Sequence, residues 1–299
     1  MQEYRDGLLG LAIGDAMGLP LVDLDRDELL KSPIVDMVSF DPNIKEGTWS
    51  IPTSLAIAIK ESFDKHNKLN RNSIMKRLVA IYNGDYSLLR HSFSFGRTTK
   101  MSIERYIDEP DLEKCGEISI GQNGSGALLM MYPIAYYSYI NKLQEKEVLN
   151  LVTYVVKLTH NHELNILGCY IYTLYLLFLL RGKDKYASLS MVQCCDFSMF
   201  HSEYLDLYSS ILKDSLKNIS LNDIKTDGYI VSTLEASLYV LLNSDNFSQS
   251  IIGAINLGNR SDIIGSIVGC MAGILYKSEN IPEEWINKLR GKDILNKYM

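Results

Sequence analysis

Apolar residues recur along this chain mainly at spacings of three and four, whereas the apolar–polar alternation of a strand is nearly absent. This pattern predicts an all-α fold. The expected helices cover residues 7–18, 52–63, 71–82, 98–106, 125–142, 146–159, 164–180, 202–217, 232–242 and 262–276. Short clusters of Gly, Asn, Asp and Ser separate them, and neither a repeat nor a linker interrupts them. We therefore expect one compact domain over residues 1–299, an orthogonal helical bundle, with Ser50 or Thr53 capping the helix that begins at residue 52.

Two of these helices carry glycine at every fourth position. One stripe consists of Gly10, Gly14 and Gly18, and the other of Gly265, Gly269 and Gly273. Glycine inside a helix costs about 1 kcal/mol relative to alanine, so two stripes need a compensating gain. Without side chains between them, two helix backbones can approach closely. Tight packing alone, with Asp15 and Asp262 as surface acids, is one interpretation; the other brings these two acids together in a site.

The segment 164–180 is almost wholly apolar and lies at the lower length limit of a membrane-spanning helix. A single span would leave helices with glycine-lined, polar-tipped motifs on both sides of the membrane. Those motifs are more consistent with packing in the interior of one folded domain. We therefore expect a central core helix here and no membrane association.

The composition narrows the function further. The chain has 299 residues, of which 46% are apolar and 22% charged, and a formal net charge of −6. No run of Lys or Arg forms a basic stripe, so no nucleic-acid partner is expected. The five cysteines include the adjacent Cys194 and Cys195 but no C-x-x-C pair. This usage, and an N-terminal sequence without a signal-peptide pattern, favour a cytoplasmic location.

Six segments, in their order and spacing, resemble the ADP-ribosylglycohydrolase family over nearly the whole chain. They are GLLGLAIGDAMGLP (7–20), GTWSIPTSLA (47–56), FSFGRTT (93–99), GSGALLM (124–130), GYIVSTLEA (228–236) and NLGNRSDIIG (256–265). The family includes dinitrogenase-reductase-activating glycohydrolase and the eukaryotic ADP-ribosylhydrolases. The resemblance implies an all-α fold of the ADP-ribosylglycohydrolase type and hydrolysis of ADP-ribosyl adducts.

Members of this family use two Mg²⁺ or Mn²⁺ ions, held by carboxylates and threonine hydroxyls. In this chain most of those positions differ. The family's Thr-Asp-Asp ligands correspond to Ser50, Ile51 and Pro52, while Arg260 and Ile263 replace an Asp and a Thr of the last motif. Further acid, amide or Arg positions of the family read Val22, Ser94, Ser125, Ser232 and Met130. Asp262 alone cannot hold two hard dications, so we expect no metal and no other cofactor, and we expect Arg260 to pair with Asp262 or Asp15.

The candidate site follows from the resemblance and from the glycine turns. Asp262 and Asp15 are the candidate catalytic residues. The candidate ligand-binding residues are Gly96, Gly124, Ser125, Gly126, His160, Tyr229, Gly258, Arg260 and Ser261. Backbone N–H groups at such turns can hold a phosphate without a metal. The expected ligand is ADP-ribose or a related nucleotide.

Two other features favour structural roles. His160 and His162 form an H-x-H that could ligate a metal, but such histidines more often cap or pack. Four tyrosines gather within 132–139, and we expect them in the core rather than stacked on a ligand base.

Three functions remain open on the sequence. The first is an inactive member that binds an ADP-ribose-like ligand or a protein partner such as an ADP-ribosyltransferase. The second is an active ADP-ribosyl or N-glycosyl hydrolase with an altered or metal-independent site that uses Asp262 or Asp15 as base. The third is a purely structural protein.

Overall fold

The structure is a computed structural model that describes residues 2–39, 42, 44–84, 95–213 and 215–299. Within these ranges it is built from α-helices and short 3₁₀ helices, with isolated β-bridges and no strand, which confirms the all-α prediction. The α-helices are α1 (Gln2–Gly18), α2 (Arg26–Lys31), α3 (Ile51–His66), α4 (Arg71–Tyr82), α5 (Arg97–Asp108), α6 (Met131–Ile140), α7 (Glu145–Val156), α8 (Glu163–Leu180), α9 (Lys185–Gln193), α10 (Ser202–Leu207), α11 (Ser209–Leu212), α12 (Ile230–Leu242), α13 (Phe247–Ile255), α14 (Ser261–Tyr276), α15 (Glu283–Lys288) and α16 (Lys292–Tyr298).

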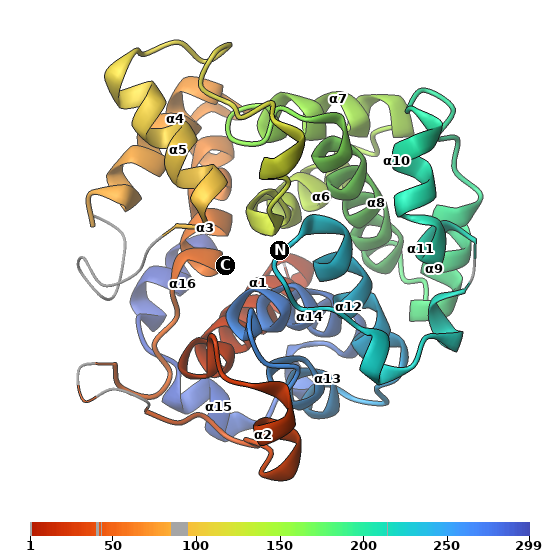
Figure 1. The fold of residues 1–299 in the computed structure, drawn as a ribbon. Helices are drawn as coiled ribbons and strands as arrows, with labels where there is room; N and C mark the ends of the chain where they lie inside the picture. The colour runs from red at the N-terminus through yellow and green to blue at the C-terminus, as the bar shows by residue number, and fades with distance from the viewer. Residues whose placement is uncertain (1, 40–41, 43, 85–94, 214) are drawn as a thin grey trace.

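The two glycine-striped helices, α1 and α14, pack against each other at the centre of the molecule (Figure 1). A methyl group on Gly14 would overlap the carbonyl of Gly265, and one on Gly10 would overlap the carbonyl of Gly269. The expected close backbone approach is therefore present. It places the C-terminal end of α1 beside the N-terminal end of α14.

α8 is the second central helix. It is long and apolar enough to cross a membrane by length and composition, and 89% of it is buried within the fold. α6, α7 and α9 pack around it (Figure 1). This is the position expected of a core helix. The tyrosines of α6 pack as predicted: Tyr132 stacks on Tyr4 at 5.0 Å between ring centroids, and Tyr137 stacks on Phe63 at 4.3 Å.

The structure corrects the predicted helix at 125–142. Residues Ser125–Met130 form a 3₁₀ helix, and α6 begins only at Met131. Proline lacks a backbone N–H and is tolerated in the first turn of an α-helix but not in its interior, so Pro133 accounts for a start at Met131. The predicted helix at 202–217 is likewise divided into α10 and α11, and residue 214 within it lies outside the described residues.

Several short helices were not predicted: α2, α9, α13, α15 and α16. Three of them begin at a capping side chain, because Asp25, Asp184 and Asn246 each accept hydrogen bonds from the first turn that follows. A helix of two turns contains too few apolar positions for periodicity to reveal it.

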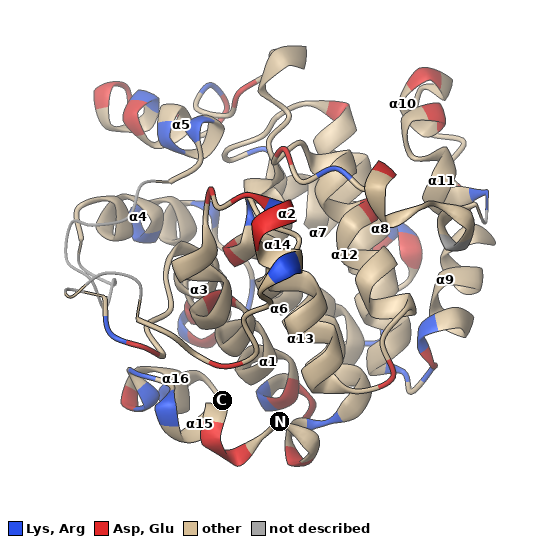
Figure 2. Cartoon of the chain, turned by 60° about the horizontal axis from the view of Figure 1, so that its bottom comes forward, with Lys and Arg blue, Asp and Glu red and all other residues tan. Residues whose placement is uncertain are grey.

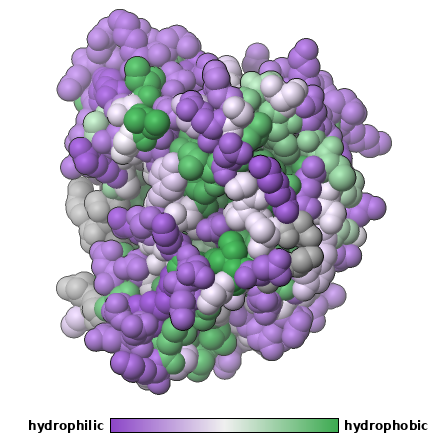
Figure 3. All heavy atoms as spheres, turned by 45° about the vertical axis from the view of Figure 1, so that its right-hand side comes forward, coloured by the Kyte–Doolittle hydropathy of each residue, from purple (hydrophilic) through white to green (hydrophobic). Residues whose placement is uncertain are grey.

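The outer surface mixes both signs of charge. In Figure 2, Lys and Arg lie among Asp and Glu on the outer helices, while the central helices are mostly uncharged. The face in Figure 3 shows hydrophobic atoms in separate patches between hydrophilic ones. On the view of Figure 2, the Lys and Arg residues of the described ranges form no continuous stripe.

Candidate active site

A cavity of about 640 Å³ opens where the first turn of α3, the N-terminal end of α14 and three loops meet. The loops precede α5, the 3₁₀ helix at Ser125 and α12. Eight candidate residues line it: Gly96, Gly124, Ser125, Gly126, His160, Tyr229, Arg260 and Asp262. The structure therefore gathers most of the predicted site, from segments spread over more than half of the chain, around one hollow.

Asp15 lies under this cavity on α1 and is fully buried. Its carboxylate accepts hydrogen bonds from the backbone N–H and hydroxyl of Ser50, at 2.9 and 2.7 Å, and from those of Thr53, at 3.0 and 2.6 Å. Ser50 and Thr53 were expected to cap α3 themselves. Instead Asp15 supplies the cap from another helix. Burial raises the pKa of Asp15, and the hydrogen bonds from Thr53 and Ser50 oppose that rise.

Asp262 is the acid that faces the cavity. It stands in the first turn of α14, and its Oδ1 is shielded from solvent with no hydrogen-bond partner among the residues that the structure describes. Burial, and then the nearby charge of Asp15, raise the pKa of Asp262 to about 7. The two acids are therefore close neighbours, as the glycine stripes predicted; backbone hydrogen bonds at Ile263 and Asp262 lower the pKa of Asp262 only in part.

Arg260 does not neutralise either acid. Its side chain is exposed, and although both acids lie within the described residues, no ion pair joins Arg260 to them. The guanidinium instead lies over Gly228, where a Cβ would come within 3.2 Å of its Nε. Its positive charge lowers the pKa of Asp262, but by less than burial and the charge of Asp15 raise it. The predicted buried pair is therefore wrong: a side chain that leaves the loop before α14 can reach water, where its charge is solvated without a partner.

Three predicted site residues lie outside the lining. One is Asp15, already described. The Ser261 hydroxyl is fully buried and donates to the carbonyl of Leu21 at 2.9 Å. Gly258 adopts a φ of +75°, and a Cβ there would lie 2.7 Å from the carbonyl oxygen of Leu24. Ser261 and Gly258 thus hold the loop before α14 against the segment that follows α1.

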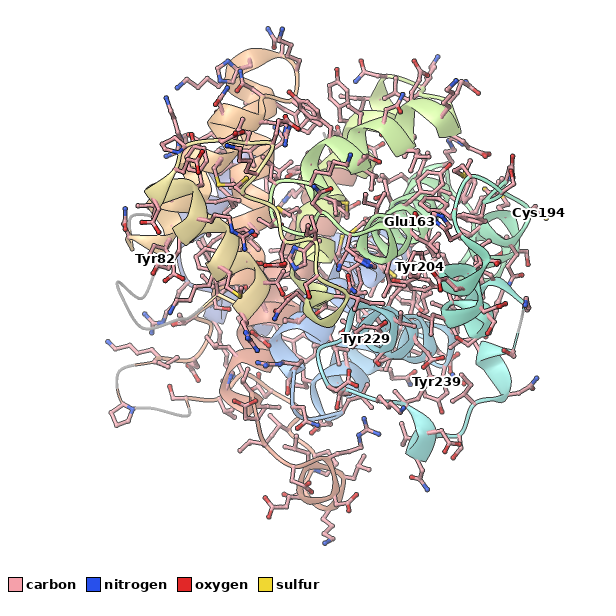
Figure 4. The ribbon with its side chains drawn as sticks, turned by 45° about the horizontal axis from the view of Figure 1, so that its top comes forward. Tyr82, Glu163, Cys194, Tyr204, Tyr229 and Tyr239 are labelled. Carbon is pink, nitrogen blue, oxygen red and sulfur yellow. The ribbon has the colours of Figure 1, made fainter. Side chains whose placement is uncertain are left out.

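The opposite wall is a short backbone pairing between two loops. Gly124 and Tyr229 form an isolated antiparallel bridge, in which Ser125 N–H donates to the Gly228 carbonyl at 3.0 Å. Tyr229 stands directly before α12 and is half-buried at the cavity edge (Figure 4). Asp227, two residues earlier, accepts from the Tyr229 N–H at 3.0 Å and fixes this turn.

His160 forms part of the wall behind Gly126. Burial lowers the pKa of His160 to about 3, so the ring is neutral at physiological pH. Its Nδ1 lies 2.8 Å from the hydroxyl of Thr159, and Nε2 lies on the side of Gly124 and Gly126. His162 instead accepts from the Leu164 N–H at the start of α8, so the two histidines do not converge. Gly96 is exposed at the mouth, in front of α5.

Several lining residues were not singled out from the sequence. Six of them lie outside the motifs quoted from the sequence: Asp23, Ile120, Gly121, Gln122, Asn123 and Asp227. The turn at Asp227 and Gly228 carried a recognisable signal. The segment 120–123 carried none, since its position depends on tertiary contacts such as the Asn165 amide donating to Asn123 Oδ1 at 2.7 Å. Phe93 and Ser94 of the FSFGRTT motif lie outside the described residues.

The donor set beside Asp262 does not fit a pair of hard dications. Asp15 already accepts four hydrogen bonds, and Ile51 and Pro52 offer no lone pair where carboxylates would be needed. Among the residues that the structure describes, no three His, Cys, Asp or Glu side chains are grouped to hold an ion. No chemical step through a metal pair is therefore derived for these residues.

Comparison with known proteins agrees with this architecture. The family model for ADP-ribosylglycohydrolase matches residues 1–299. An ADP-ribosylarginine hydrolase Tri1 of Serratia proteamaculans is 27% identical over 97% of this chain and 75% of its own length. The ADP-ribosyl-[dinitrogen reductase] glycohydrolase of Rhodospirillum rubrum is 22% identical over 94% of this chain and 88% of its own length.

A solved structure titled as an ADP-ribosylglycohydrolase-related protein complex superimposes with a TM-score of 0.83. It is 22% identical, and the match covers 99% of this chain and 95% of that chain. At this identity the likeness shows the fold. Together with the whole-length family match, it establishes that the chain belongs to the ADP-ribosylglycohydrolase family.

Proposed function

We propose that this protein binds ADP-ribose or a related nucleotide in the cavity without a metal pair, and that it is inactive as a metal-dependent hydrolase. The observation that carries the proposal is an open cavity of mixed polar and apolar lining in which Ile51 and Pro52 contribute side chains without metal-binding atoms. A cavity that binds a nucleotide does not need the carboxylates that a pair of dications requires. A binding function accounts for both the cavity and these side chains.

The lining suits such a ligand. A volume of about 640 Å³ lies within the range of small-molecule sites. Arg97 and Arg260 at the cavity can attract a diphosphate, and Tyr229 offers a ring on which a base or ribose can rest. The unpartnered Oδ1 of Asp262 can accept a hydrogen bond from a ligand hydroxyl, which would remove the cost of leaving it unpaired.

A protein partner is a second form of the same proposal. An ADP-ribosyltransferase, or an ADP-ribosylated protein, would present the nucleotide at the mouth of the cavity while its polypeptide stays outside. A cytoplasmic location is part of this proposal and fits the five free cysteines.

An active hydrolase with an altered site is the alternative. Two relatives are named ADP-ribosylarginine hydrolase, and Asp262 has a pKa of about 7, where a general acid or base works best. In this alternative Asp262 would deprotonate the attacking water directly. Release of ADP-ribose would then persist in EDTA and be lost in Asp262→Asn.

Binding is tested by calorimetric titration of ADP-ribose in EDTA. We expect the wild type to bind, and Tyr229→Ala to bind about tenfold more weakly, within the range of 1–3 kcal/mol for a base stacked on an aromatic ring. Tyr239→Ala is the matched control, because Tyr239 lies farther along α12, outside the lining (Figure 4). Absence of binding at millimolar ADP-ribose would refute the proposal and favour a structural role.

Hydrolysis is tested in parallel with ADP-ribosylated arginine and serine substrates, with Mg²⁺ or Mn²⁺ and with EDTA. We expect no released ADP-ribose under either condition. Release that EDTA abolishes would contradict the claim of inactivity. Release that EDTA leaves unchanged would support the alternative hydrolase.

A further inference from the structure

A second cavity, of about 360 Å³, lies between the C-terminal half of α3 and the first turns of α4. Its walls are formed by Ala58, Glu61, Ser62, Lys65, His66, Asn70, Asn72, Ser73, Lys76 and Arg77. α3 presents its first turn to the main cavity and its last turns to this one. The centres of the two sets of α3 residues, 51–55 and 58–66, are about nine residues apart, which is about 14 Å along the helix at 1.5 Å per residue. We call the second cavity the α3–α4 pocket.

The α3–α4 pocket has an excess of positive charge. Lys65 on α3 and Lys76 on α4 line it, together with Arg77. The nearby carboxylates are already engaged, since Glu61 pairs with Arg77 and Asp64 pairs with Lys60 at 2.5 Å. The other oxygen of Glu61 is shielded from solvent. Within the described residues, neither Lys65 nor Lys76 has an ion-pair partner.

The uncharged part of the lining consists mainly of donors. Asn70 uses Oδ1 to accept from the Ser73 N–H at 2.9 Å, which leaves its amide Nδ2 available. Asn72 is exposed, and no hydrogen bond of its side chain is found in the described part of the chain. Ser73 adds a hydroxyl. These groups and the two lysines on facing helices make the concave surface rich in donors, while Oε2 of Glu61 is a buried acceptor without a hydrogen-bond partner among the described residues.

We propose that the α3–α4 pocket binds the phosphate group of a small phosphorylated ligand, independently of the main cavity. A phosphate offers three acceptor oxygens and up to two negative charges, which matches two unpaired ammonium groups and several neutral donors. A monocarboxylate would supply half of that charge. Since Lys65 and Lys76 come from different helices, the bound phosphate links α3 to α4.

The probe is inorganic pyrophosphate, titrated by calorimetry into the full chain at low ionic strength, with succinate at equal ionic strength as the comparison anion. We expect pyrophosphate to bind and succinate to bind much more weakly. The double substitution Lys65→Gln and Lys76→Gln should weaken pyrophosphate binding by at least about tenfold, as expected for the loss of two charge-assisted contacts. Lys146→Gln with Lys183→Gln is the matched control, since both are exposed lysines elsewhere with the same change of charge.

A third variant, Arg260→Gln, separates the two cavities. Pyrophosphate binding that persists in Arg260→Gln and is lost in the Lys65/Lys76 variant supports the proposal, even if ADP-ribose does not bind at all. Equal binding by the Lys65/Lys76 variant and the wild type would overturn it. So would loss of binding in Arg260→Gln alone, which would assign the pyrophosphate to the main cavity.

Discussion

Two aspartates of the same site have opposite environments. Asp15 accepts four hydrogen bonds from the first turn of α3, whereas Asp262 has an oxygen with no protein partner. The backbone N–H groups at a helix start favour a carboxylate, so the charge of Asp15 is stabilised although it is buried. That charge then disfavours ionisation of Asp262. Asp15 therefore holds α3 in place, and Asp262 is the acid whose Oδ1 is left for a group from outside the described residues.

Asp262→Asn should change how stability depends on pH. The folded-state pKa of Asp262 is raised to about 7 from an ordinary value of 3.8. The protonated side chain therefore stabilises the fold fully below pH 3.8, and this contribution is lost as the pH rises through 7. At pH 8 the free energy of unfolding of the variant should exceed that of the wild type by about 1–3 kcal/mol, because asparagine keeps the polar side chain but removes the buried negative charge beside Asp15.

Urea denaturation at pH 5 and pH 8 measures this difference. Asp223→Asn serves as the control, because Asp223 is exposed and should leave the pH dependence unchanged. A wild type and an Asp262→Asn variant that lose stability equally between the two pH values would contradict the assignment of Asp262 as the titrating group.

At the residue scale, the sequence predicted which side chains meet but not how they are oriented. Most of the candidate residues line one cavity because they follow motifs whose order and spacing carry the fold. The orientation of Asp15 toward Ser50 and Thr53, and of Arg260 over Gly228, depends on tertiary contacts between distant segments. Periodicity and motif spacing contain no information on such contacts.

Among the contacts between helices, the packing of α1 against α14 is the one that the sequence predicted most directly. Glycine at every fourth position lowers helix propensity, so its recurrence in two helices required a packing reason. The structure supplies that reason as backbone-to-backbone contact along both stripes. By contrast, the 3₁₀ start of the segment 125–142 depends on Pro133, and the short helices depend on single capping residues. Such local signals are weaker than a stripe of three glycines that repeats over about two helical turns.

Gly14→Ala should be strongly destabilising. The substitution gains about 1 kcal/mol of helix propensity, but its methyl group would overlap the carbonyl of Gly265, which is held by α14. Overpacking costs about 1–3 kcal/mol and more where backbone blocks relief, so we expect a net loss of about 2 kcal/mol or more. Chemical denaturation followed by circular dichroism measures the loss.

Gly253→Ala on α13 is the matched control. A Cβ there would lie 3.2 Å from Cγ1 of Val240, a side-chain atom that can move by a few tenths of an ångström. Its effect should be close to neutral. If Gly14→Ala were as well tolerated as Gly253→Ala, backbone contact would not be the reason for the stripes.

At the scale of the whole molecule, the central helices have a structural role and the site is built on their ends. The first turn of α3, the end of α1 and the start of α14 meet at the main cavity, and the other end of α3 forms the α3–α4 pocket. Side chains at these helix ends can therefore differ without a change in the buried interior that defines the fold.

Metal ions should therefore have no effect on the global stability of the wild type. Metal ions that bind only the folded state, at a hundredfold excess over their dissociation constant, would add about 2.7 kcal/mol to the free energy of unfolding. For a chain of this size such a gain would raise the melting temperature by several degrees. We expect the same melting temperature in EDTA and in millimolar MnCl₂.

The triple substitution Ile51→Asp, Pro52→Asp and Arg260→Asp places carboxylates at the floor of the main cavity. The melting temperature of this variant should rise when Mn²⁺ is added. A saturable rise in the wild type itself, or two ions within about 4 Å of each other at Asp262 in a Mn²⁺-soaked crystal, would show that the donor set described above is sufficient after all.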